Sequence, residues 1–339
     1  MENFLANIAY IHRLNANELG IRRGQARGAG RFFLVAKTCV SFFPPLSEVM
    51  LNDHVLLSVI PPFANEPVLT NYVYRNSKHA TLDENEDRDE YRIYLNSAND
   101  PDHSFYHPND IVVFVKIVPP DAPEGLTYKL FKYAEGDREY SQLASLLASA
   151  DPRRGTHAVV ALNEVTFLGG LSKITIGKKI IPKEILEEAF REPVEHAPVT
   201  EEDKYETTRV VRSRSFRDLI LYFYEDKCAI TGSDLVIEHK EFKNLEAAHI
   251  LARASGGGSH PSNGLALERN LHWAFDKGFF TLTKDFKVDV HANAQKIPYL
   301  KSKHGLPIFL PQDSRSRPNQ DSMAWHRKNV FGMFMNGDV

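Results

Sequence analysis

Hydrophobic and polar positions alternate in short runs through the first half of the chain. β-Branched and aromatic residues form these runs, and Pro, Asn and Asp turns separate them, which is typical of an all-β barrel or sandwich. The predicted strands are RFFLVAK (31–37), VLLSVIPPF (55–63), PVLTNYVYRN (67–76), EYRIYLN (90–96), DIVVFVKIV (110–118), TYKLFKYA (127–134), 158–167 and 171–176. Helical spacing predicts helices over 136–150 and 182–191, the second with proline in its first turn.

The pattern changes after residue 191. Residues 192–208 are rich in Pro, Glu and Thr and lack apolar periodicity, which indicates an extended linker. Residues 209–227 then predict an amphipathic helix whose outer-face arginines, Arg212, Arg214 and Arg217, are either solvated or in contact with phosphate. A chain of 339 residues with 42% hydrophobic content fits two domains. We therefore predict one domain over 1–185, a linker over 186–208 and a second domain over 209–339.

The residues best suited to catalysis lie in 245–282, LEAAHILARASGGGSHPSNGLALERNLHWAFDKGFFTL. His249 ends an apolar strand, and a Gly/Ser-rich loop leads to Asn263. A second short strand follows, and then a helix that contains His272 and Asp276. Residues four apart lie on one face of a helix, so His272 and Asp276 can hold one cation together.

The order of histidine on a strand, asparagine in a loop and histidine on a helix resembles the HNH, or ββα-metal, endonucleases. CAITG (228–232), NGLALERNLHWAFDKGFF (263–280) and AWHRKNVF (324–331) are similar to the restriction-type branch of that family. The resemblance implies that His249 is the general base and that Asn263 fixes the loop and orients the imidazole. It also implies that His272, the third catalytic residue, and Asp276 bind one divalent metal ion. Abundance favours Mg²⁺, and a mixed N/O site also accepts Mn²⁺ or another transition metal.

One position departs from the family pattern. Many members have a metal ligand directly before the general base, where this chain has Ala248. Water, phosphate or another side chain must then complete the coordination. Glu246 is a candidate, although strand alternation places it on the side of Ala248 and away from that of His249.

The cysteines and the remaining histidines suggest no second metal site. Cys39 and Cys228 are too far apart in sequence for a zinc knuckle and do not form a disulfide framework, so no structural zinc is expected. Four further histidines are expected to be structural or solvent-facing: His239, His260, His304 and His326.

A glycine- and arginine-rich stretch precedes the first barrel strand. IHRLNANELGIRRGQARGAGRFFLV (11–35) cannot be a stable helix, because each glycine costs about 1 kcal/mol there. A flexible basic loop is one interpretation. The stretch also resembles the first DNA-contacting arm of EcoRII-like recognition domains, a β-pseudobarrel shared with the plant B-three transcription factors. A second arm of that family corresponds to the acidic loop 83–90 and the strand after it.

The EcoRII-like resemblance implies that the two arms hold the major groove from opposite sides. Arginine can bind a guanine edge through two hydrogen bonds, and a carboxylate can accept one from a cytosine amino group. The acids at 83–87 are expected to be solvated. The implied DNA-reading residues are Asn17, Arg22, Arg23, Gln25 and Arg27 in the first arm, and Arg88, Glu90 and Arg92 in the second.

The distribution of charge is compatible with DNA binding. The net charge is −3, but residues 209–339 hold 19 Lys/Arg against 14 Asp/Glu, leaving 22 against 30 elsewhere. Residues 11–37 hold six basic residues and one acid. Local positive surface governs phosphate binding more than net charge does. No apolar stretch is long enough to span a membrane, and the N-terminal residues MENFLANIAYIHRL lack the charged start and apolar block of a signal peptide. A soluble, cytoplasmic protein without a membrane partner is therefore expected.

These patterns predict an α+β protein of two domains, an N-terminal β-pseudobarrel with flanking helices and a C-terminal ββα-metal HNH domain. The predicted function is that of a site-specific type II restriction endonuclease, in which a one-metal site hydrolyses double-stranded DNA. Cutting both strands implies a homodimer or two successive engagements, because one HNH site cuts one strand. Three alternatives remain: a nuclease that depends on methylated DNA, a DNA-binding regulator with an inactive nuclease domain, and a non-specific or RNA-directed nuclease.

Overall fold

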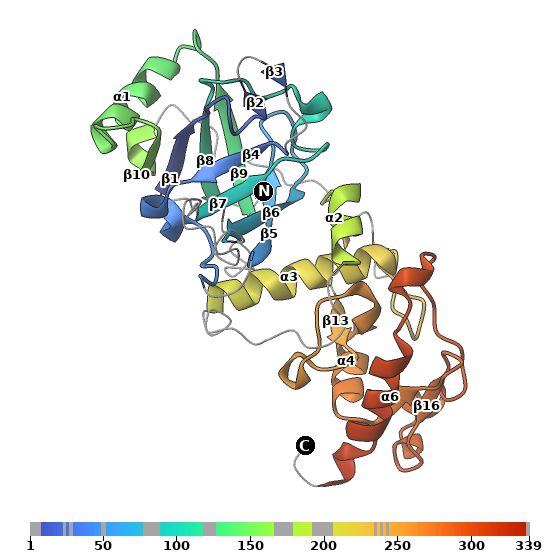
Figure 1. The fold of residues 1–339 in the computed structure, drawn as a ribbon. Helices are drawn as coiled ribbons and strands as arrows, with labels where there is room; N and C mark the ends of the chain where they lie inside the picture. The colour runs from blue at the N-terminus through green and yellow to red at the C-terminus, as the bar shows by residue number, and fades with distance from the viewer. Residues whose placement is uncertain are drawn as a thin grey trace. The chain divides into compact units, whose positions relative to one another are not determined.

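The computed structural model describes two compact units with separate hydrophobic cores (Figure 1). Met1–Ile185 and Thr200–Ser215 form the first, and Leu186–Val199 and Phe216–Val339 form the second. The described residues are 8–22, 25–26, 30–48, 52–76, 89–117, 127–165, 179–191, 206–233, 236–237, 240–241 and 244–336. Most of the predicted linker lies outside them, so its extended form stays a prediction. No helix among these residues has the length and apolar character needed to cross a membrane.

The first unit contains one eight-stranded sheet in the order β10-β1-β8-β9-β5-β6-β7-β4. Neighbouring strands are antiparallel except β5 and β9, which are parallel. The strands are β1 (Ile8–Arg13), β4 (Phe32–Val35), β5 (His54–Ile60), β6 (Val68–Arg75), β7 (Glu90–Tyr94), β8 (Ile111–Ile117), β9 (Thr127–Tyr133) and β10 (His157–Ala161). A separate hairpin pairs β2 (Ile21–Arg22) with β3 (Gln25–Ala26).

The sheet curls into a nearly closed barrel around an aromatic core (Figure 1). Tyr10 on β1 donates from its hydroxyl to the carbonyl oxygen of Leu34 on the edge strand β4, at 3.0 Å. Alternation explains the interior: β4 buries Phe33 and Val35, and its partner β7 buries Tyr91 and Ile93. The predicted β-pseudobarrel is confirmed.

Helices and short 3₁₀ turns flank this barrel. The helix predicted over 136–150 is α1 (Tyr140–Ala150), which buries Leu143 and Leu147 against the outer side of β1, β8 and β10. The helix predicted over 182–191 is α2 (Lys183–Ala189). The strand predicted over 158–167 ends at Ala161, and the strand predicted over 171–176 lies outside the described residues. The 3₁₀ turns are η1 (Lys37–Phe42), η2 (Pro101–His103) and η3 (Leu162–Val165).

The second unit is built on two strands and a helix in direct succession. The antiparallel pair β13 (Leu245–His249) and β14 (Gly264–Glu268) is followed by α4 (Arg269–Asp276). The helix before them, α3, covers Glu206–Phe223, and its residues from Phe216 onward belong to this unit. The other elements are β11 (Val236–Ile237), β12 (Lys240–Glu241), η6 (Arg253–Ser255), η7 (Pro261–Asn263), β15 (Phe280–Leu282), β16 (Val288–Val290), η8 (Ala294–Lys296), α5 (Pro298–Lys301), η9 (Ser314–Ser316), α6 (Gln320–Asn329) and η10 (Met333–Asn336).

Two of the arginines predicted on the outer face of α3 bond within the protein. Arg212 Nη2 donates to Asp53 Oδ1 at 2.5 Å, and Arg217 Nη2 donates to the Leu245 carbonyl oxygen at 2.9 Å. Asp53 is buried, and a buried carboxylate is stable only when it is paired. A solvated face was therefore the wrong prediction for Arg212 and Arg217.

Candidate active site

The strand pair β13–β14 and helix α4 position the predicted catalytic residues. The register pairs Leu245 with Glu268 at one end and His249 with Gly264 at the other. Helix α4 begins directly after Glu268. His249 therefore ends one strand beside the first residue of the next, with Asn263 immediately before it.

The His249 side chain is held by a ring contact, and one of its ring nitrogens has no partner in the described part of the chain. Its imidazole stacks on Phe216 of α3, with 3.9 Å between ring centroids and 14° between planes. Burial, followed by the nearby charges of Arg253 and His272, lowers the pKa of His249 to about 4. Nε2 is buried and has no hydrogen-bond partner among the described residues. His249 is therefore neutral near pH 7, with a ring nitrogen able to accept a proton.

Gly264 permits the close approach of α3 to this strand pair. A Cβ atom at Gly264 would lie 2.2 Å from Cδ1 of Ile220 and 2.8 Å from Cζ of Phe216. Real Cβ atoms do not approach neighbours so closely, so any other residue would force the side chains of Ile220 and Phe216 to shift. The packing of Phe216 beside His249 is thus suited to a glycine at this strand position.

Asn263 ties together the loop between the two strands. Its side chain is fully buried; Oδ1 accepts from Leu251 N at 2.9 Å, and Nδ2 donates to the carbonyl oxygens of Leu251 and Gly258, both at 3.0 Å. Ile250 N also donates to the Asn263 carbonyl oxygen at 2.9 Å. These bonds fix the backbone immediately after His249.

His272 lies between two carboxylates. Its Nε2 is 3.3 Å from Asp276 Oδ2, one helical turn later, and its Nδ1 is 2.8 Å from Glu246 Oε2 on β13. Burial alone would lower the pKa of His272, but the hydrogen bonds and charges of Asp276 and Glu246 outweigh it and raise that pKa above its ordinary value. The structure thus brings together the two residues predicted to bind the metal ion and adds a third.

Glu246, named from the sequence as a candidate ligand, contacts two residues of α4 that the sequence analysis did not predict as its neighbours. Alternation along β13 puts it on the side of Ala248, and α4 packs on that side, so Glu246 contacts His272 and, through Oε1, Nε of Arg269 at 3.0 Å. His249 instead contacts α3. The signal in the sequence was that α4 follows β14 without a connecting loop.

The donors at this site fit a divalent cation only in part. His272 and Asp276 form a mixed N/O pair with His272 half-buried and Asp276 exposed, while Ala248 is fully buried and offers no ligand atom. Among the described residues no group of three or more His, Cys, Asp or Glu side chains has the arrangement of a metal site. His272 and Asp276 could therefore supply two ligands of a divalent ion, and Ala248 could supply none.

The predicted DNA-reading residues belong to the first unit. Asn17 is exposed just before the β2–β3 hairpin, in which Arg22 pairs with Gln25. Glu90 Oε2 accepts from Arg92 Nε at 3.0 Å, and the Arg92 guanidinium lies 4.2 Å from the Phe32 ring centroid. Predicted residues outside the described part of the chain are Arg23, Arg27 and Arg88.

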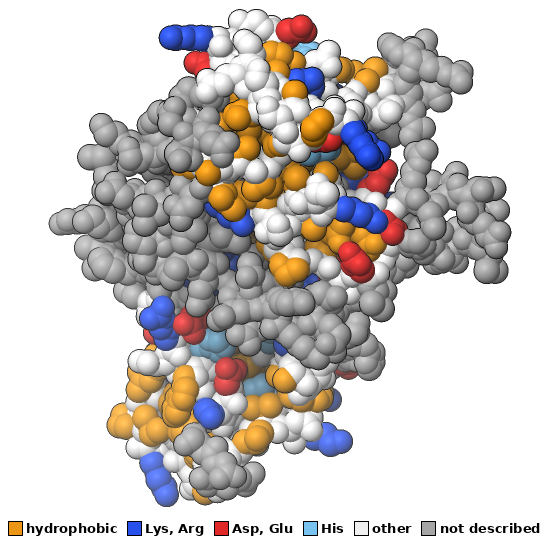
Figure 2. Space-filling model, turned by 90° about the vertical axis from the view of Figure 1, so that its left-hand side faces the viewer, with side chains coloured by type: hydrophobic (Ala, Val, Ile, Leu, Met, Phe, Trp, Pro, Cys, Tyr) orange, Lys and Arg blue, Asp and Glu red, His pale blue; other side chains and the backbone are white. Residues whose placement is uncertain are grey.

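Charged side chains are mixed on the face drawn in Figure 2. The described Lys and Arg side chains there lie among Asp and Glu and do not gather into one basic patch.

Both cysteines, Cys39 and Cys228, are buried and form no disulfide bond with each other.

Residues 228–283 match a family model described as HNH endonuclease. This range includes His249, Asn263, His272 and Asp276, so the chain contains an HNH endonuclease domain, and the predicted resemblance is confirmed there. Comparison with curated proteins finds no match.

Solved structures similar to this chain include two restriction-enzyme structures. One is a modification-dependent TagI restriction endonuclease, 16% identical over 80% of this chain and 65% of that chain, with a TM-score of 0.28. The other is the B3 domain of UbaLAI restriction endonuclease with cognate DNA, 17% identical over 47% of this chain and 90% of that chain, with a TM-score of 0.30. The chain thus covers less than two thirds of the TagI structure's length.

Proposed function

We propose that this chain is a metal-dependent DNA endonuclease of restriction type. The second unit would hydrolyse the phosphodiester backbone, and the first would recognise a short duplex sequence. The proposal rests on one observation: a segment that matches HNH endonucleases places a neutral histidine with a free Nε2 at the end of β13, on the same ββα assembly as the His272–Asp276 pair. Phosphodiester hydrolysis needs a proton acceptor for the attacking water and stabilisation of negative charge.

His249 would act as the general base. With a pKa of about 4 it is protonated in only about one molecule in a thousand at pH 7. Its Nε2 would take the proton while the water oxygen attacks phosphorus, and the Phe216 ring would hold the imidazole in place. An anionic phosphate beside His249 raises that pKa toward the range in which a base works best near neutral pH.

His272 and Asp276 would hold the divalent ion. Such an ion acts as a Lewis acid that stabilises charge on the phosphate and the leaving oxygen. Glu246 would accept the Nδ1–H of His272, which fixes the tautomer and leaves the Nε2 lone pair for the ion. Asn263 would hold the loop so that His249 keeps its position. We propose Mg²⁺ as the ion, and the same donors accept Mn²⁺.

The strand register supports DNA recognition by two arms. The first arm leads into β4 at Phe32, and the segment 77–88 leads into β7 at Glu90. Phe32 pairs with Tyr94, and Val35 pairs with Tyr91, so the two arms join this strand pair at opposite ends. Four residue steps at about 3.3 Å each separate the ends by roughly 13 Å, close to the width of about 12 Å of the B-DNA major groove.

A double-strand break would require two active sites. One HNH site cuts one strand, so we propose that two copies of the chain act together on double-stranded DNA, as a dimer or in two successive events.

A digest tests the proposed function. Purified protein is incubated with unmodified and with cytosine-methylated viral DNA, in Mg²⁺ or in EDTA. Discrete bands from unmodified DNA that require the metal ion are expected. Bands only from methylated DNA would replace the proposal with a modification-dependent nuclease, and a smear would exclude sequence recognition. Intact DNA on both substrates, with binding retained, would indicate a DNA-binding regulator.

A further inference from the structure

The arm stem, which we define as Glu18–Arg22 together with Gly30–Phe32, is closed by backbone hydrogen bonds. Phe32 N donates to the Glu18 carbonyl oxygen at 3.0 Å, and Leu95 N donates to the Arg31 carbonyl oxygen at 2.9 Å. The stem therefore attaches the β2–β3 hairpin to the edge of the barrel.

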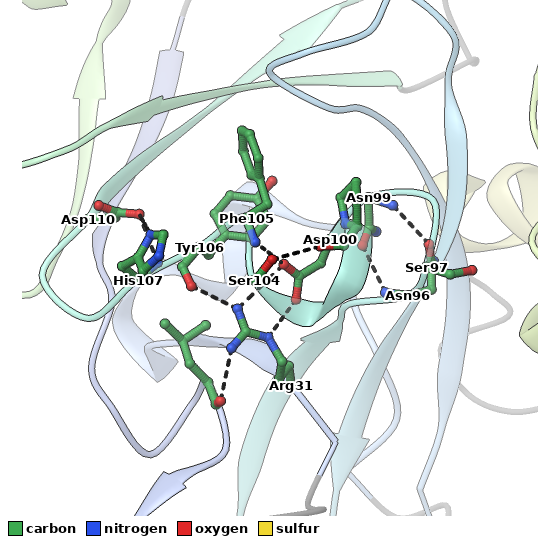
Figure 3. Close-up of polar contacts among 12 residues, drawn as sticks. Arg31, Asn96, Ser97, Asn99, Asp100, Ser104, Phe105, Tyr106, His107 and Asp110 are labelled. Atoms are coloured by element: carbon green, nitrogen blue, oxygen red, sulfur yellow. Dashed lines mark hydrogen bonds and ion pairs between the residues drawn. The ribbon is translucent and has the colours of Figure 1, made fainter. Parts of the chain in front are cut away.

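The Arg31 side chain is used entirely inside the first unit (Figure 3). Nε donates to Asp100 Oδ2 at 2.5 Å, Nη1 to the Leu19 carbonyl oxygen at 3.1 Å, and Nη2 to the Tyr106 carbonyl oxygen at 2.8 Å. Only 11% of this side chain is exposed, and none of the Asp100 side chain is. Arg31 thus joins both sides of the arm stem to the loop 100–106 and is not available to a phosphate.

Asp100 is itself held by the loop that contains it. Its Oδ1 accepts from Phe105 N at 3.1 Å, and its backbone N donates to the Asn96 carbonyl oxygen at 2.9 Å (Figure 3). A fully buried carboxylate with these partners cannot rotate freely. The Arg31 guanidinium therefore has one fixed position, because its planar fork must match Asp100.

A second buried pair holds the arm stem at Glu18. Glu18 Oε2 is 2.6 Å from His12 Nε2, and Asn15 Nδ2 donates to Glu18 Oε1 at 2.6 Å. His12 and Glu18 are both fully buried. The arm stem is thus fixed at Glu18 and at Arg31 by buried polar groups, whereas a merely flexible loop would need neither.

We infer that Arg31 and Asp100 are positioning residues for DNA recognition: they set where the first arm enters the major groove and do not contact DNA themselves. This inference rests on the proposed function, in which that arm recognises bases. A base contact through two hydrogen bonds requires a well-placed backbone, and one such contact accounts for about tenfold to a hundredfold in discrimination.

The experiment compares binding of two duplexes by full-length variants. A pool of short duplexes with a randomised centre is first selected on the wild-type protein in Ca²⁺ to prevent cutting. Affinities for the enriched duplex and for an unrelated duplex are then measured over a range of salt concentrations. The variants are Asp100→Asn, Arg31→Met and the double variant. Asp53→Asn is the matched control, since Asp53 is also buried, accepts from the backbone N of Ser47 and pairs with Arg212 away from the arm stem.

Asp100→Asn and Arg31→Met should each weaken binding of the enriched duplex about tenfold to a hundredfold, with little change in binding of the unrelated duplex. The double variant should lose no more affinity for the enriched duplex than the more strongly affected single variant, because the pair acts as one unit. The Asp53→Asn control should keep full discrimination. Thermal unfolding measures whether each variant is folded at the assay temperature. If a variant is unfolded, Arg31→Lys is measured in its place.

Other outcomes would overturn the inference. Equal discrimination by Asp100→Asn and Asp53→Asn would show that the pair only stabilises the fold. If Arg31→Met alone reduced the slope of log affinity against log salt by about 0.9, Arg31 would contact a phosphate directly. If the wild-type protein enriched no sequence, sequence recognition itself would be wrong, and this inference with it.

Discussion

The two carboxylates beside His272 suggest how the side chains of the candidate metal site divide their roles. One of its ring nitrogens is directed to Glu246 and the other to Asp276, at 2.8 and 3.3 Å. A metal-binding imidazole commonly donates its second N–H to a carboxylate, which orients the ring and strengthens the ligand. In the proposed function, Asp276 would therefore bind the ion and Glu246 would orient His272.

Replacing Glu246 tests this assignment. Glu246→Ala should weaken Mn²⁺ binding about tenfold to a hundredfold, because the orienting carboxylate is lost. Glu246→Gln should lose much less Mn²⁺ affinity, since its side-chain oxygen still accepts a hydrogen bond from Nδ1 of His272. Calorimetric titration of the DNA-free protein measures both affinities. Glu268→Gln is the control, as Glu268 bonds Thr231 and Ser233 instead. Equal losses for the two Glu246 variants would make Glu246 a direct ligand.

The sequence predicted part of this site for a geometric reason. His272 and Asp276 are four residues apart on a helix, so their pairing follows from helical geometry alone. The Glu246 contact could not be predicted with the same certainty, because it depends on how closely α4 packs against β13. The buried, free Nε2 of His249 depends likewise on tertiary packing, since α3 provides the Phe216 ring.

Among the elements, α3 and the β13–β14 pair leave no room for one added atom at Gly264. Gly264 lies where α3 crosses the strand end, and Ile220 and Phe216 occupy the space that a side chain would need. Overpacking a close-packed site forces side chains and backbone to shift.

Gly264→Ala should therefore destabilise the second unit by about 1–3 kcal/mol. The chain's two tryptophans, Trp273 and Trp325, both lie in that unit, so urea unfolding followed by tryptophan fluorescence reports it alone. Adding Ile220→Ala removes the atoms closest to the new Cβ. The double variant should therefore lose less unfolding free energy than the sum of the losses in the two single variants. Unchanged unfolding of Gly264→Ala would contradict the contact.

Strand positions could be predicted because alternation is a local signal. The run EYRIYLN, for example, became β7 with Tyr91 and Ile93 inside. The exposure of the α3 arginines could not be predicted from a local pattern in the same way. Whether an arginine faces solvent depends on what packs beside it, and Asp53, which pairs with Arg212, lies 159 residues away in sequence.

On the scale of the whole molecule, buried neutral histidines make stability depend on pH. His326 stacks on Phe275, and its Nδ1 and Nε2 are within hydrogen-bond distance of Thr281 Oγ1 and the Phe275 carbonyl oxygen. Burial is the main cause that lowers the pKa of His326 to about 4. The prediction that His326 is structural agrees with these contacts.

Acid should therefore destabilise the second unit through His326. Its folded-state pKa lies below its ordinary value, so the unfolded chain binds more protons between about pH 6.5 and pH 4. The stabilisation is complete above that window and is lost as pH falls through it. His249 acts in the same direction, and His272, with its raised pKa, acts in the opposite one.

The measurement compares wild type with His326→Gln at pH 7 and pH 5, by urea unfolding and tryptophan fluorescence. The difference in unfolding free energy between the two pH values should be smaller in the variant by about 2 kcal/mol, as expected for a pKa lowered from 6.5 to about 4. Equal pH dependence in the two proteins would mean that His326 is not held neutral.

The central claim is that His249 removes the proton from the attacking water, and single-turnover cleavage tests it most directly. Protein in excess over one duplex that the wild-type protein cuts is mixed with Mg²⁺, and the cleavage rates of wild type, His249→Ala and the control His304→Ala are compared. His304 is exposed and contacts Asp289 and the backbone N of Val290. His249→Ala should be slower by about 10²–10⁴-fold with unchanged DNA and metal affinity, and His304→Ala should cut normally. Cleavage by His249→Ala at the wild-type rate would contradict the account.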